Sequence, residues 1–386
     1  MKNVLFIHQS AELYGSDKAL LKLLLNIDRY KINPVVIIPN EGPLFYELKN
    51  NNIEVFIAPV IKLHRGIFTI KNFFKTIRDF LKSYYTLSKL DKKYNFNIVY
   101  SNTLAVLAGY FFSLVKAKKH VWHVHEIVLK PKLVSKLYAF LLNSKNNNFT
   151  IYNSIATEEY WQSQTKNSKA NYKLIYNGLE PFENNCTLEV IKKYKKELTG
   201  LENSILIGLV GRINKNKGHE QLIKAFSKIV EKHDHVKLLI VGTTSPNQEK
   251  YLNSINQIIE NYKLEEKIII LPFQDNIELI WSIIDIAVVP SLIPESFGFV
   301  ALEAMLKQKP VIASNFGGVS EIVLNEETGL LINPFKTEEI ITALTKLITD
   351  EMLRLEMGKK GFLRAVHNFS LEKYCNLIQE ILLKES

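Results

Sequence analysis

The chain is poor in cysteine, with only Cys186 and Cys375 among 386 residues. The two lie far apart and in no spacing typical of metal ligands. This argues against a structural zinc site and against a disulfide framework. We therefore expect a protein of a reducing compartment.

Long apolar runs are also missing. The best candidate, residues 104–115, has about a dozen residues, fewer than the roughly 18 that a membrane-spanning helix needs, and fits a buried helix. The first residues, Met1–His8, contain too short an apolar run for a signal peptide and fit a first strand. We therefore expect a cytoplasmic protein.

Three phosphate- and metal-binding motifs are absent from the sequence. There is no Gly-x-Gly-x-x-Gly and no Gly-x-x-x-x-Gly-Lys-Ser/Thr, so dinucleotide-binding and P-loop functions lack their phosphate-cradling turns. There is also no Asp-x-Asp, a common carboxylate clamp for a divalent ion.

What the sequence does contain is an alternation of short apolar runs with longer amphipathic ones, which is typical of βαβ units and parallel sheets. The length suggests two domains, and an Asn-Gly and polar stretch at residues 177–185 marks the boundary. The expected strands are Val4–His8, Pro34–Pro39, Val55–Val60, Ile98–Asn102, His120–His125, Phe149–Ser154, Lys173–Tyr176, Ile205–Val210, Lys237–Val241, Lys267–Leu271, Ile286–Pro290, Pro310–Ala313 and Leu330–Asn333.

The most informative motif places two carboxylates, Glu295 and Glu303, around Phe297-Gly298-Phe299. It follows an apolar strand-like run and opens a helix-like run, so both carboxylates are expected near the carboxyl end of a strand, where ligands bind in α/β sheets. The free N–H groups of the first helical turn favour a phosphate. The alternative is a pair of solvated glutamates on a surface helix.

A second motif, Gly211-Arg212-x-x-x-x-Lys217-Gly218, follows another buried strand-like run. A glycine lets the backbone approach a ligand closely. Arg212 can fork onto a diphosphate and Lys217 adds a point charge. The alternative is two basic residues in a solvated loop.

Together with Gly317-Gly318-Val-Ser-Glu321, these motifs resemble the retaining GT-B glycosyltransferases often called family 4. The resemblance implies two Rossmann-like, doubly wound parallel-sheet domains that face a central cleft. It implies an N-terminal acceptor-side domain, residues 1–180 plus a final helix at about 368–386, and a nucleotide-sugar donor domain, residues 181–367.

The resemblance also implies roles for single residues. Glu303 would hold the ribose hydroxyls, and Glu295 would accept hydrogen bonds from the donor sugar. Phe297, Gly298 and Phe299 would lend backbone amides to the sugar or the diphosphate. With Arg212 and Lys217 neutralising the leaving diphosphate, we expect no metal and no cofactor, and a donor that is UDP-linked.

In the first domain, Trp122-His123-Val-His125-Glu126 places both histidines on one face of a strand. The resembled family has a histidine near this strand end, and we assign His125 there, with His123 as second choice. A satisfied structural histidine is the alternative. A pair spaced by two could also suggest a metal, but no third ligand is evident.

Other parts of the acceptor side carry weaker signals. Gly15, in the turn after the first strand, is expected to allow a phosphate contact, although many relatives carry two glycines there. Asn102 is a candidate acceptor contact. Phe273 replaces a usual glycine in a loop that borders the base pocket of the resembled fold, which leaves the identity of the base open.

Positive charge is concentrated in the first half. Residues 1–180 carry 25 Lys/Arg and 12 Asp/Glu, and residues 60–145 alone carry 16 against 3. One helix face would hold Lys71, Lys75, Arg78 and Lys82, and another would hold Phe73, Ile77, Phe80 and Tyr84. A second basic stretch, residues 130–145, adds Lys132, Lys136, Tyr138 and Phe140.

This pattern predicts contact with an anionic membrane surface, peripheral and on the inner face of the cell membrane. The alternative is that the apolar face packs on the sheet and the lysines are solvated. Nucleic acid is not expected, because no recognised reader motif accompanies the charge.

The sequence therefore predicts a retaining glycosyltransferase. It would move a hexose-type sugar from a nucleotide-diphospho-sugar to a glycan or polyprenyl-linked acceptor in bacterial surface polysaccharide synthesis. The alternatives are a GT-B nucleotide-sugar epimerase or phosphorylase, and a non-catalytic nucleotide-sugar-binding protein at the membrane.

Overall fold

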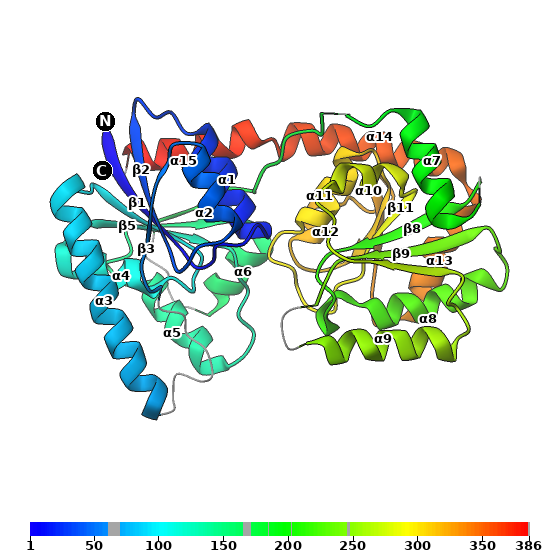
Figure 1. Ribbon diagram of the computed structural model, residues 1–386, viewed down its shortest axis with the longest axis horizontal. Helices are drawn as coiled ribbons and strands as arrows, with labels where there is room; N and C mark the ends of the chain where they lie inside the picture. The colour runs from blue at the N-terminus through cyan, green and yellow to red at the C-terminus, as the bar shows by residue number, and fades with distance from the viewer. Residues whose placement is uncertain (61–69, 165–170, 184, 202, 245–247, 385–386) are drawn as a thin grey trace. The chain divides into compact units, whose positions relative to one another are not determined.

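The computed structural model describes residues 1–60, 70–164, 171–183, 185–201, 203–244 and 248–384, and the side chains of residues 70–73 lie outside this description. The chain divides into two compact units. The first comprises Met1–Gly178 and Leu371–Ser386, and the second comprises Leu179–Ser370. Each unit is built around its own parallel sheet (Figure 1).

The first unit contains a seven-stranded sheet with the order β3-β2-β1-β4-β5-β6-β7. Its strands are β1 (Lys2–His8), β2 (Ile32–Ile38), β3 (Glu54–Ile57), β4 (Ile98–Asn102), β5 (Lys119–Val124), β6 (Phe149–Tyr152) and β7 (Tyr172–Leu174). All neighbouring strands are parallel. The strand order reverses between β1 and β4, which makes this pair the topological switch point where ligands bind in such sheets.

Helices cover both faces of this sheet. They are α1 (Gly15–Asn26), α2 (Pro43–Asn50), α3 (Ile70–Tyr94), α4 (Leu107–Lys116), α5 (Lys132–Leu142), α6 (Ile155–Ser163) and α15 (Leu371–Lys384). Leu5 and Ile7 of β1 pack against α3 and α4 in one apolar cluster. Because side chains alternate along a strand, His8 points to the opposite face, where α1 lies.

The last helix, α15, belongs to the first unit although it follows the whole second unit in the sequence. The Asp28 N–H donates to Gln379 Oε1 at 2.7 Å, and the Cys375 thiol lies 3.9 Å from the Lys22 carbonyl oxygen. Ile378 and Leu382 are fully buried. The apolar face of α15 therefore completes the first core beside α1.

The second unit contains a six-stranded parallel sheet with the order β10-β9-β8-β11-β12-β13. Its strands are β8 (Ile205–Val210), β9 (Val236–Val241), β10 (Ile268–Leu271), β11 (Ile286–Val289), β12 (Val311–Ser314) and β13 (Gly329–Ile332). Its helices are α7 (Leu188–Thr199), a 3-10 turn η2 (Lys215–Lys217), α8 (His219–Val230), α9 (Glu249–Asn261), α10 (Ile277–Ile283), α11 (Phe299–Leu306), α12 (Val319–Ile322), α13 (Thr337–Thr349) and α14 (Glu351–Asn368). The order reverses between β8 and β11.

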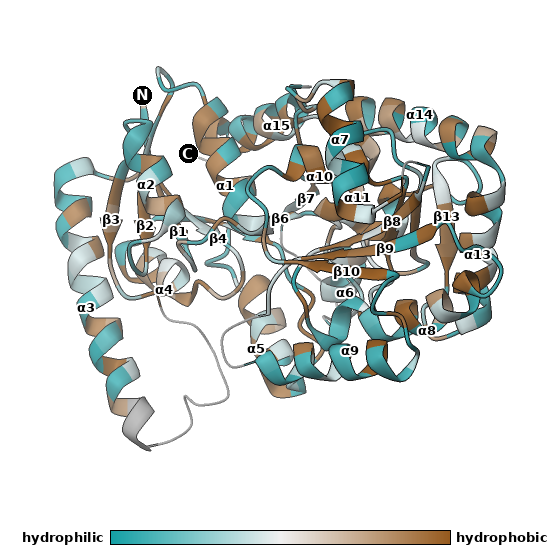
Figure 2. Ribbon diagram, turned by 45° about the vertical axis from the view of Figure 1, so that its right-hand side comes forward, coloured by the Kyte–Doolittle hydropathy of each residue, from teal (hydrophilic) through white to brown (hydrophobic). Residues whose placement is uncertain are grey.

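The strands of the second sheet are mostly apolar, as Figure 2 shows in brown for much of β8, β9 and β10. Strands buried on both faces need this composition. All thirteen strands expected from the sequence are present, with ends shifted by at most three residues. Within the described residues, no helix combines the length and the apolar character needed to cross a membrane.

Candidate active site

In the second unit, the conspicuous sequence motifs follow the two strands that flank the switch point. Gly211 and Arg212 come directly after β8, and Glu295 lies in the loop after β11. Because β8 and β11 are parallel neighbours, both loops leave the sheet at the same edge. The topology therefore brings together residues about 80 positions apart.

The loop after β8 is anchored to the neighbouring strand. The Gly211 N–H donates to the Val241 carbonyl at 2.9 Å, and the Ile213 N–H donates to the Thr243 carbonyl at the same distance. The Ile213 side chain is buried, whereas Arg212 is exposed. Anchoring on both sides of Arg212 fixes its backbone at the sheet edge and leaves its guanidinium accessible.

Lys217, at the end of η2, reaches the loop after β11. Its Nζ lies 2.6 Å from Glu295 Oε1, and the two side chains are 26% and 13% exposed. Ser291 donates its hydroxyl to the same carboxylate oxygen. The backbone joins the two loops as well, because the Leu292 N–H donates to the Asn216 carbonyl at 2.7 Å. Lys217 and Glu295, which sequence patterns suggest separately, thus form one ion pair.

The pair sets the charge of Glu295. Burial raises the pKa of this carboxyl group, but the charge and hydrogen bond of Lys217 and the hydrogen bond of Ser291 outweigh burial and lower the pKa below its ordinary value. Glu295 is therefore a carboxylate at neutral pH, and it can accept hydrogen bonds from hydroxyl groups.

Two glycines let the Glu295 loop lie against its neighbour. Gly317 has φ +76°, and a Cβ there would lie 2.7 Å from the Glu295 nitrogen. The Gly318 N–H then donates to the Glu295 carbonyl at 2.7 Å. Gly298, with φ +116°, turns the chain into α11. The first hydrogen bond inside α11 runs from the Ala301 N–H to Gly298, so the N–H groups of the first turn face out from the helix end.

Glu303 lies one turn along α11 and contacts α10. The indole N–H of Trp281, which is fully buried, donates to Glu303 Oε2 at 3.2 Å. This hydrogen bond fixes one carboxylate oxygen. Phe297 is buried, and its ring lies 5.1 Å from that of Phe299, so these two aromatic side chains pack while their backbone forms the loop.

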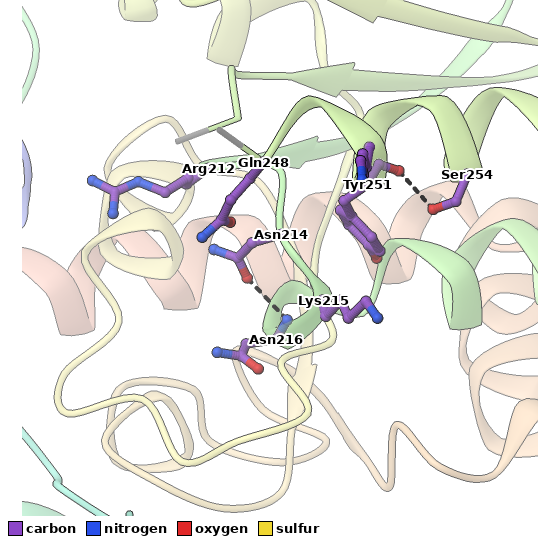
Figure 3. Close-up of a pocket in the computed structure, with 8 residues that line it drawn as sticks. Arg212, Asn214, Lys215, Asn216, Gln248, Tyr251 and Ser254 are labelled. Atoms are coloured by element: carbon purple, nitrogen blue, oxygen red, sulfur yellow. Dashed lines mark hydrogen bonds between the residues drawn. The ribbon is translucent and has the colours of Figure 1, made fainter. Parts of the chain in front are cut away.

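A pocket of about 580 Å³ lies beside the Arg212 loop and the start of α9 (Figure 3). Among the described residues that line it, three are cationic and none is acidic. They are Arg212, Lys215 and Lys250, with Asn214, Asn216, Gln248, Tyr251 and Ser254. Figure 3 shows the side chains of Asn214 and Gln248 pointing toward one another beside Arg212. This chemistry suits an anion that also carries hydroxyl or carbonyl groups.

In the first unit, a buried polar network follows β1, β4 and β5. The Asn102 side-chain amide donates to His8 Nδ1 at 2.9 Å, and His8 Nε2 lies 2.6 Å from Asp17 Oδ1. Asn102 Oδ1 lies 3.2 Å from His125 Nε2. His8 Nδ1 also lies 3.2 Å from the Asn102 carbonyl oxygen, so Asn102 and Asp17 hold the His8 ring from both of its nitrogens. Asn102 therefore links His125 to the helix that begins at Gly15.

His123 and His125 share one side of the sheet edge, and their ring centroids are 3.9 Å apart. The Tyr100 hydroxyl oxygen and His123 Nδ1 are hydrogen-bonded at 2.6 Å. His123 Nε2 is buried and has no hydrogen-bond partner within the described part of the chain. Burial lowers the pKa of His125 to about 3 and holds that of His123 well below its ordinary value. Both imidazoles are therefore neutral at pH 7.

Glu126 follows His125 and ties the β4 and β5 loops together. Its Oε2 accepts from the Leu104 N–H at 3.0 Å and from the His125 N–H at 3.2 Å. Burial raises the pKa of this carboxyl group to about 7, although both backbone N–H groups oppose the shift. Glu126 therefore positions the His125 backbone and titrates near neutral pH.

The remaining residues suggested by the sequence are placed as follows. Gly15 is the first residue of α1, and Tyr14 is the N-cap residue before it. The Tyr14 N–H donates to Asp17 Oδ2 at 3.0 Å. Phe273 is 52% exposed in the loop after β10. The Lys71 side chain lies outside the described residues. No group of three or more metal-ligating side chains occurs among the residues described.

Several residues of these sites escaped the sequence patterns. His8, Glu126, Ser291 and Trp281 each contact an expected site residue, and Asp17 contacts His8. The sequence could have indicated His8 and Ser291 by their position alone, because each lies at or just after the carboxyl end of a strand that flanks the switch point. Trp281 had none, since its contact depends on how α10 packs against α11.

We expect Lys217 and Glu295 to stabilise the second unit jointly. Lys217→Met or Glu295→Gln alone leaves a partly buried partner without its ion pair, at a cost of about 1–3 kcal/mol. The double variant should lose less than the sum of the two, with a coupling of about 1 kcal/mol or more in urea unfolding. The exposed pair Lys228–Glu231, at 2.9 Å, is the control and should show less than about 0.5 kcal/mol. Strict additivity at Lys217 and Glu295 would contradict the prediction.

Glu126 should make stability depend on pH. Between the ordinary carboxyl pKa of 4.5 and about 7, the folded state keeps a proton that the unfolded state releases. The contribution of Glu126 to the free energy of unfolding therefore falls as pH rises through this window, by on the order of 3 kcal/mol, while the buried neutral His123 and His125 contribute with the opposite sign below their ordinary pKa of 6.5. In Glu126→Gln this fall should disappear, whereas Glu12→Gln, at an exposed position, should retain it. Urea unfolding at pH 5, 6, 7 and 8 measures both, and equal slopes for wild type and Glu126→Gln would refute the assignment.

The match to a protein family lies in the second unit. Residues 190–364 match the family model described as Glycosyl transferases group 1. An uncharacterized glycosyltransferase of Methanocaldococcus jannaschii is 32% identical over 182 residues, which are 46% of this chain and 45% of that protein. The capsular polysaccharide biosynthesis glycosyltransferase CapM of Staphylococcus aureus is 34% identical over 188 residues, again 46% and 45%. The match thus spans a little less than half the length of either relative.

In structure, the similarity covers both units. The crystal structure of Anabaena HepE in complex with UDP and glucose has a TM-score of 0.85 and 23% identity, and the match covers 100% of both chains. Two Rossmann-like parallel-sheet domains of this kind are the GT-B fold. Residues 190–364 are therefore similar to the glycosyl transferases group 1 family, and the fold of the chain is that of the GT-B glycosyltransferases.

Proposed function

We propose that the protein is a retaining glycosyltransferase that moves a hexose-type sugar from a nucleotide-diphospho-sugar, UDP-linked, to a glycan or lipid-linked acceptor. The observation that carries this proposal is the Lys217–Glu295 pair beside Arg212. It sets cations and a carboxylate side by side at the switch point of the unit that matches the family model.

The cations suit the leaving group. Breaking the bond to a nucleoside diphosphate develops negative charge on phosphate oxygens, and preorganised cations stabilise that charge without a cofactor. Arg212 is exposed beside a pocket that Lys215 and Lys250 also line. Its guanidinium can bind two phosphate oxygens at once. Lys217 has three donors, so it can keep Glu295 and contact a phosphate oxygen as well.

The carboxylates suit the hydroxyl groups of the donor. Glu295 is ionised and oriented by Lys217 and Ser291, so it can accept hydrogen bonds from the sugar. Glu303 accepts a hydrogen bond from Trp281, and we assign its carboxylate to the ribose hydroxyls. Backbone amides at Phe297, Gly298 and Phe299 would complete the contacts to the sugar or diphosphate.

From the first unit, we assign His125 to the sugar and acceptor side. Its imidazole is neutral at pH 7, so its role is to hydrogen-bond a hydroxyl and not to supply a full positive charge. The acceptor oxygen attacks the anomeric carbon from the face that the diphosphate leaves, through an ion-paired, oxocarbenium-like state. The new C–O bond forms as the old one breaks, and the departing phosphate oxygen takes the acceptor proton. Asn102 and His123 support this side of the site.

The biological setting follows by analogy. CapM is a capsular polysaccharide biosynthesis protein. We propose a similar role in bacterial surface polysaccharide synthesis, at the cytoplasmic face of the membrane.

The donor-side assignment predicts large losses of turnover. Arg212→Ala, Lys217→Ala, Glu295→Gln and Glu303→Gln should each reduce turnover about 10²-fold or more, because each removes a charge or acceptor aimed at the reacting donor. Release of nucleoside diphosphate from a panel of UDP- and GDP-hexoses, with and without simple glycoside acceptors, measures this. Lys228→Ala, an exposed lysine of the same unit, is the control.

Each outcome of that assay separates the proposal from its alternatives. Near-normal turnover of Arg212→Ala and Lys217→Ala would overturn the phosphate assignment. Conversion of the nucleotide sugar without any acceptor would indicate an epimerase, and dependence on inorganic phosphate would indicate a phosphorylase. Donor binding in a thermal-shift assay without any turnover would indicate a binding protein. Proton NMR of the product reports whether the anomeric configuration is retained.

Turnover should not require a divalent ion. The sequence has no Asp-x-Asp clamp, and Arg212 and Lys217 supply the positive charge that such an ion would provide. EDTA at about 5 mM chelates any metal that copurifies with the protein, and the rate in its presence should equal the rate with added Mg²⁺. A strict requirement for Mg²⁺ or Mn²⁺ would refute the metal-free assignment.

A further inference from the structure

The helices α3 and α5 of the first unit expose apolar side chains. On α5, Leu133, Leu137 and Phe140 are 72%, 42% and 71% exposed. Their spacing of four and three residues places them on one face of the helix. The opposite face packs inward, because Tyr138, Leu141 and Leu142 belong to the buried cluster around Trp122. Helix α5 thus has two apolar faces, of which one packs in the core and the other is exposed to solvent.

Helix α3 also has one apolar face that packs inward and one that is exposed. The exposed face is not the one expected from the sequence. The Phe80 ring contacts Phe111 and the Tyr84 ring contacts Phe112, each at 6.0 Å between centroids, so these two residues pack on α4. The exposed row shares only Ile77 with the expected one. It consists of Phe74, Ile77, Leu81 and Tyr85, which are 67%, 42%, 60% and 72% exposed.

Exposed lysines and arginine surround both apolar rows. Lys75, Arg78 and Lys82 are exposed on α3, and Lys130, Lys132, Lys136 and Lys145 are exposed on or beside α5. In Figures 1 and 2, α5 and the Ile70 end of α3 lie toward the same side of the first unit. Residues 74–85 and 130–145 together hold these seven basic residues and one acidic residue, Asp79, so positive charge predominates on these two segments.

A pocket of about 630 Å³ lies at the end of α5. Phe140 and Ala139 line it, together with Lys136, Lys145, Asn143, Ser144, Asn146 and Gln164. Among the described residues that line it, two are cationic and none is acidic. A pocket of this kind beside an exposed Phe offers a phosphate site next to an apolar anchor.

We propose that α5 and the first half of α3 form a surface that binds an anionic phospholipid bilayer. The apolar rows enter the boundary between headgroups and acyl chains, and the basic residues contact the lipid phosphates. The pocket beside Phe140 receives one headgroup. A protein or nucleic-acid partner fits less well, because two large apolar rows flanked by lysines match the layered chemistry of a bilayer edge.

The test is sedimentation of the full chain with vesicles. Vesicles of phosphatidylglycerol and phosphatidylcholine in equal parts should bind the protein, and pure phosphatidylcholine vesicles should bind it at least about tenfold more weakly. Binding should weaken with added salt. Inorganic phosphate at millimolar concentration should not compete, which separates a lipid surface from a site for free phosphate.

Two sets of variants probe the surface. Leu133→Ser with Phe140→Ser removes apolar anchors, and Lys132→Gln, Lys136→Gln and Lys145→Gln together remove charge. All five residues are exposed, so the fold should persist. Each set should reduce vesicle binding at least about tenfold while release of nucleoside diphosphate in the absence of vesicles stays unchanged. This second readout keeps the lipid proposal separate from the proposed activity.

Matched controls come from the second unit. Met352→Ser with Leu355→Ser removes equally exposed apolar residues from α14, and Lys224→Gln, Lys232→Gln and Lys263→Gln remove three exposed lysines. These variants should bind vesicles as the wild type does. Equal loss in the control and α5 sets would overturn the proposal. The proposal would also be overturned if the wild type did not sediment with anionic vesicles, or if it bound a single-stranded oligonucleotide and not the vesicles.

Discussion

The candidate site of the second unit depends on the ion pair between Lys217 and Glu295. A carboxylate that is 13% exposed stays ionised only when a cation and hydrogen-bond donors offset the loss of water, and Lys217 and Ser291 supply both. The pair also joins the loops that leave β8 and β11, so the position of Arg212 relative to α11 follows from it. Gly317 and Gly318 complete the arrangement, because only residues without a side chain let that backbone approach Glu295.

The two units solve the same topological problem with different chemistry. In each sheet, polar residues gather after the strands that flank the point where the strand order reverses. The second unit places cations and carboxylates there, which suits phosphates and the hydroxyls of a nucleotide sugar. The first unit places neutral imidazoles and an amide there, held by the buried His8–Asp17 contact. Neutral hydrogen-bonding groups suit an uncharged hydroxyl, such as that of the acceptor we propose.

Helix periodicity explains why the exposed row of α3 differs from the expected one. A long helix with apolar residues around much of its circumference offers two rows, and the sequence does not say which row meets the sheet. Phe80 and Tyr84 pack because α4 presents Phe111 and Phe112 to them. The high proportion of basic residues, in contrast, is a property of the sequence. It is the same whichever apolar row of α3 packs inward.

The sequence by itself determined the order of strands and helices, because apolar runs of strand length between amphipathic segments leave little choice of secondary structure. It also marked Arg212, Lys217 and Glu295, since glycines and charges directly after such runs have few structural uses. Only the tertiary structure decided that Lys217 pairs with Glu295, that Asn102 links His125 to His8, and that Trp281 reaches Glu303. These contacts join residues 22 to 94 positions apart. Such distances are closed by parallel strand pairing and helix packing, which no local pattern encodes.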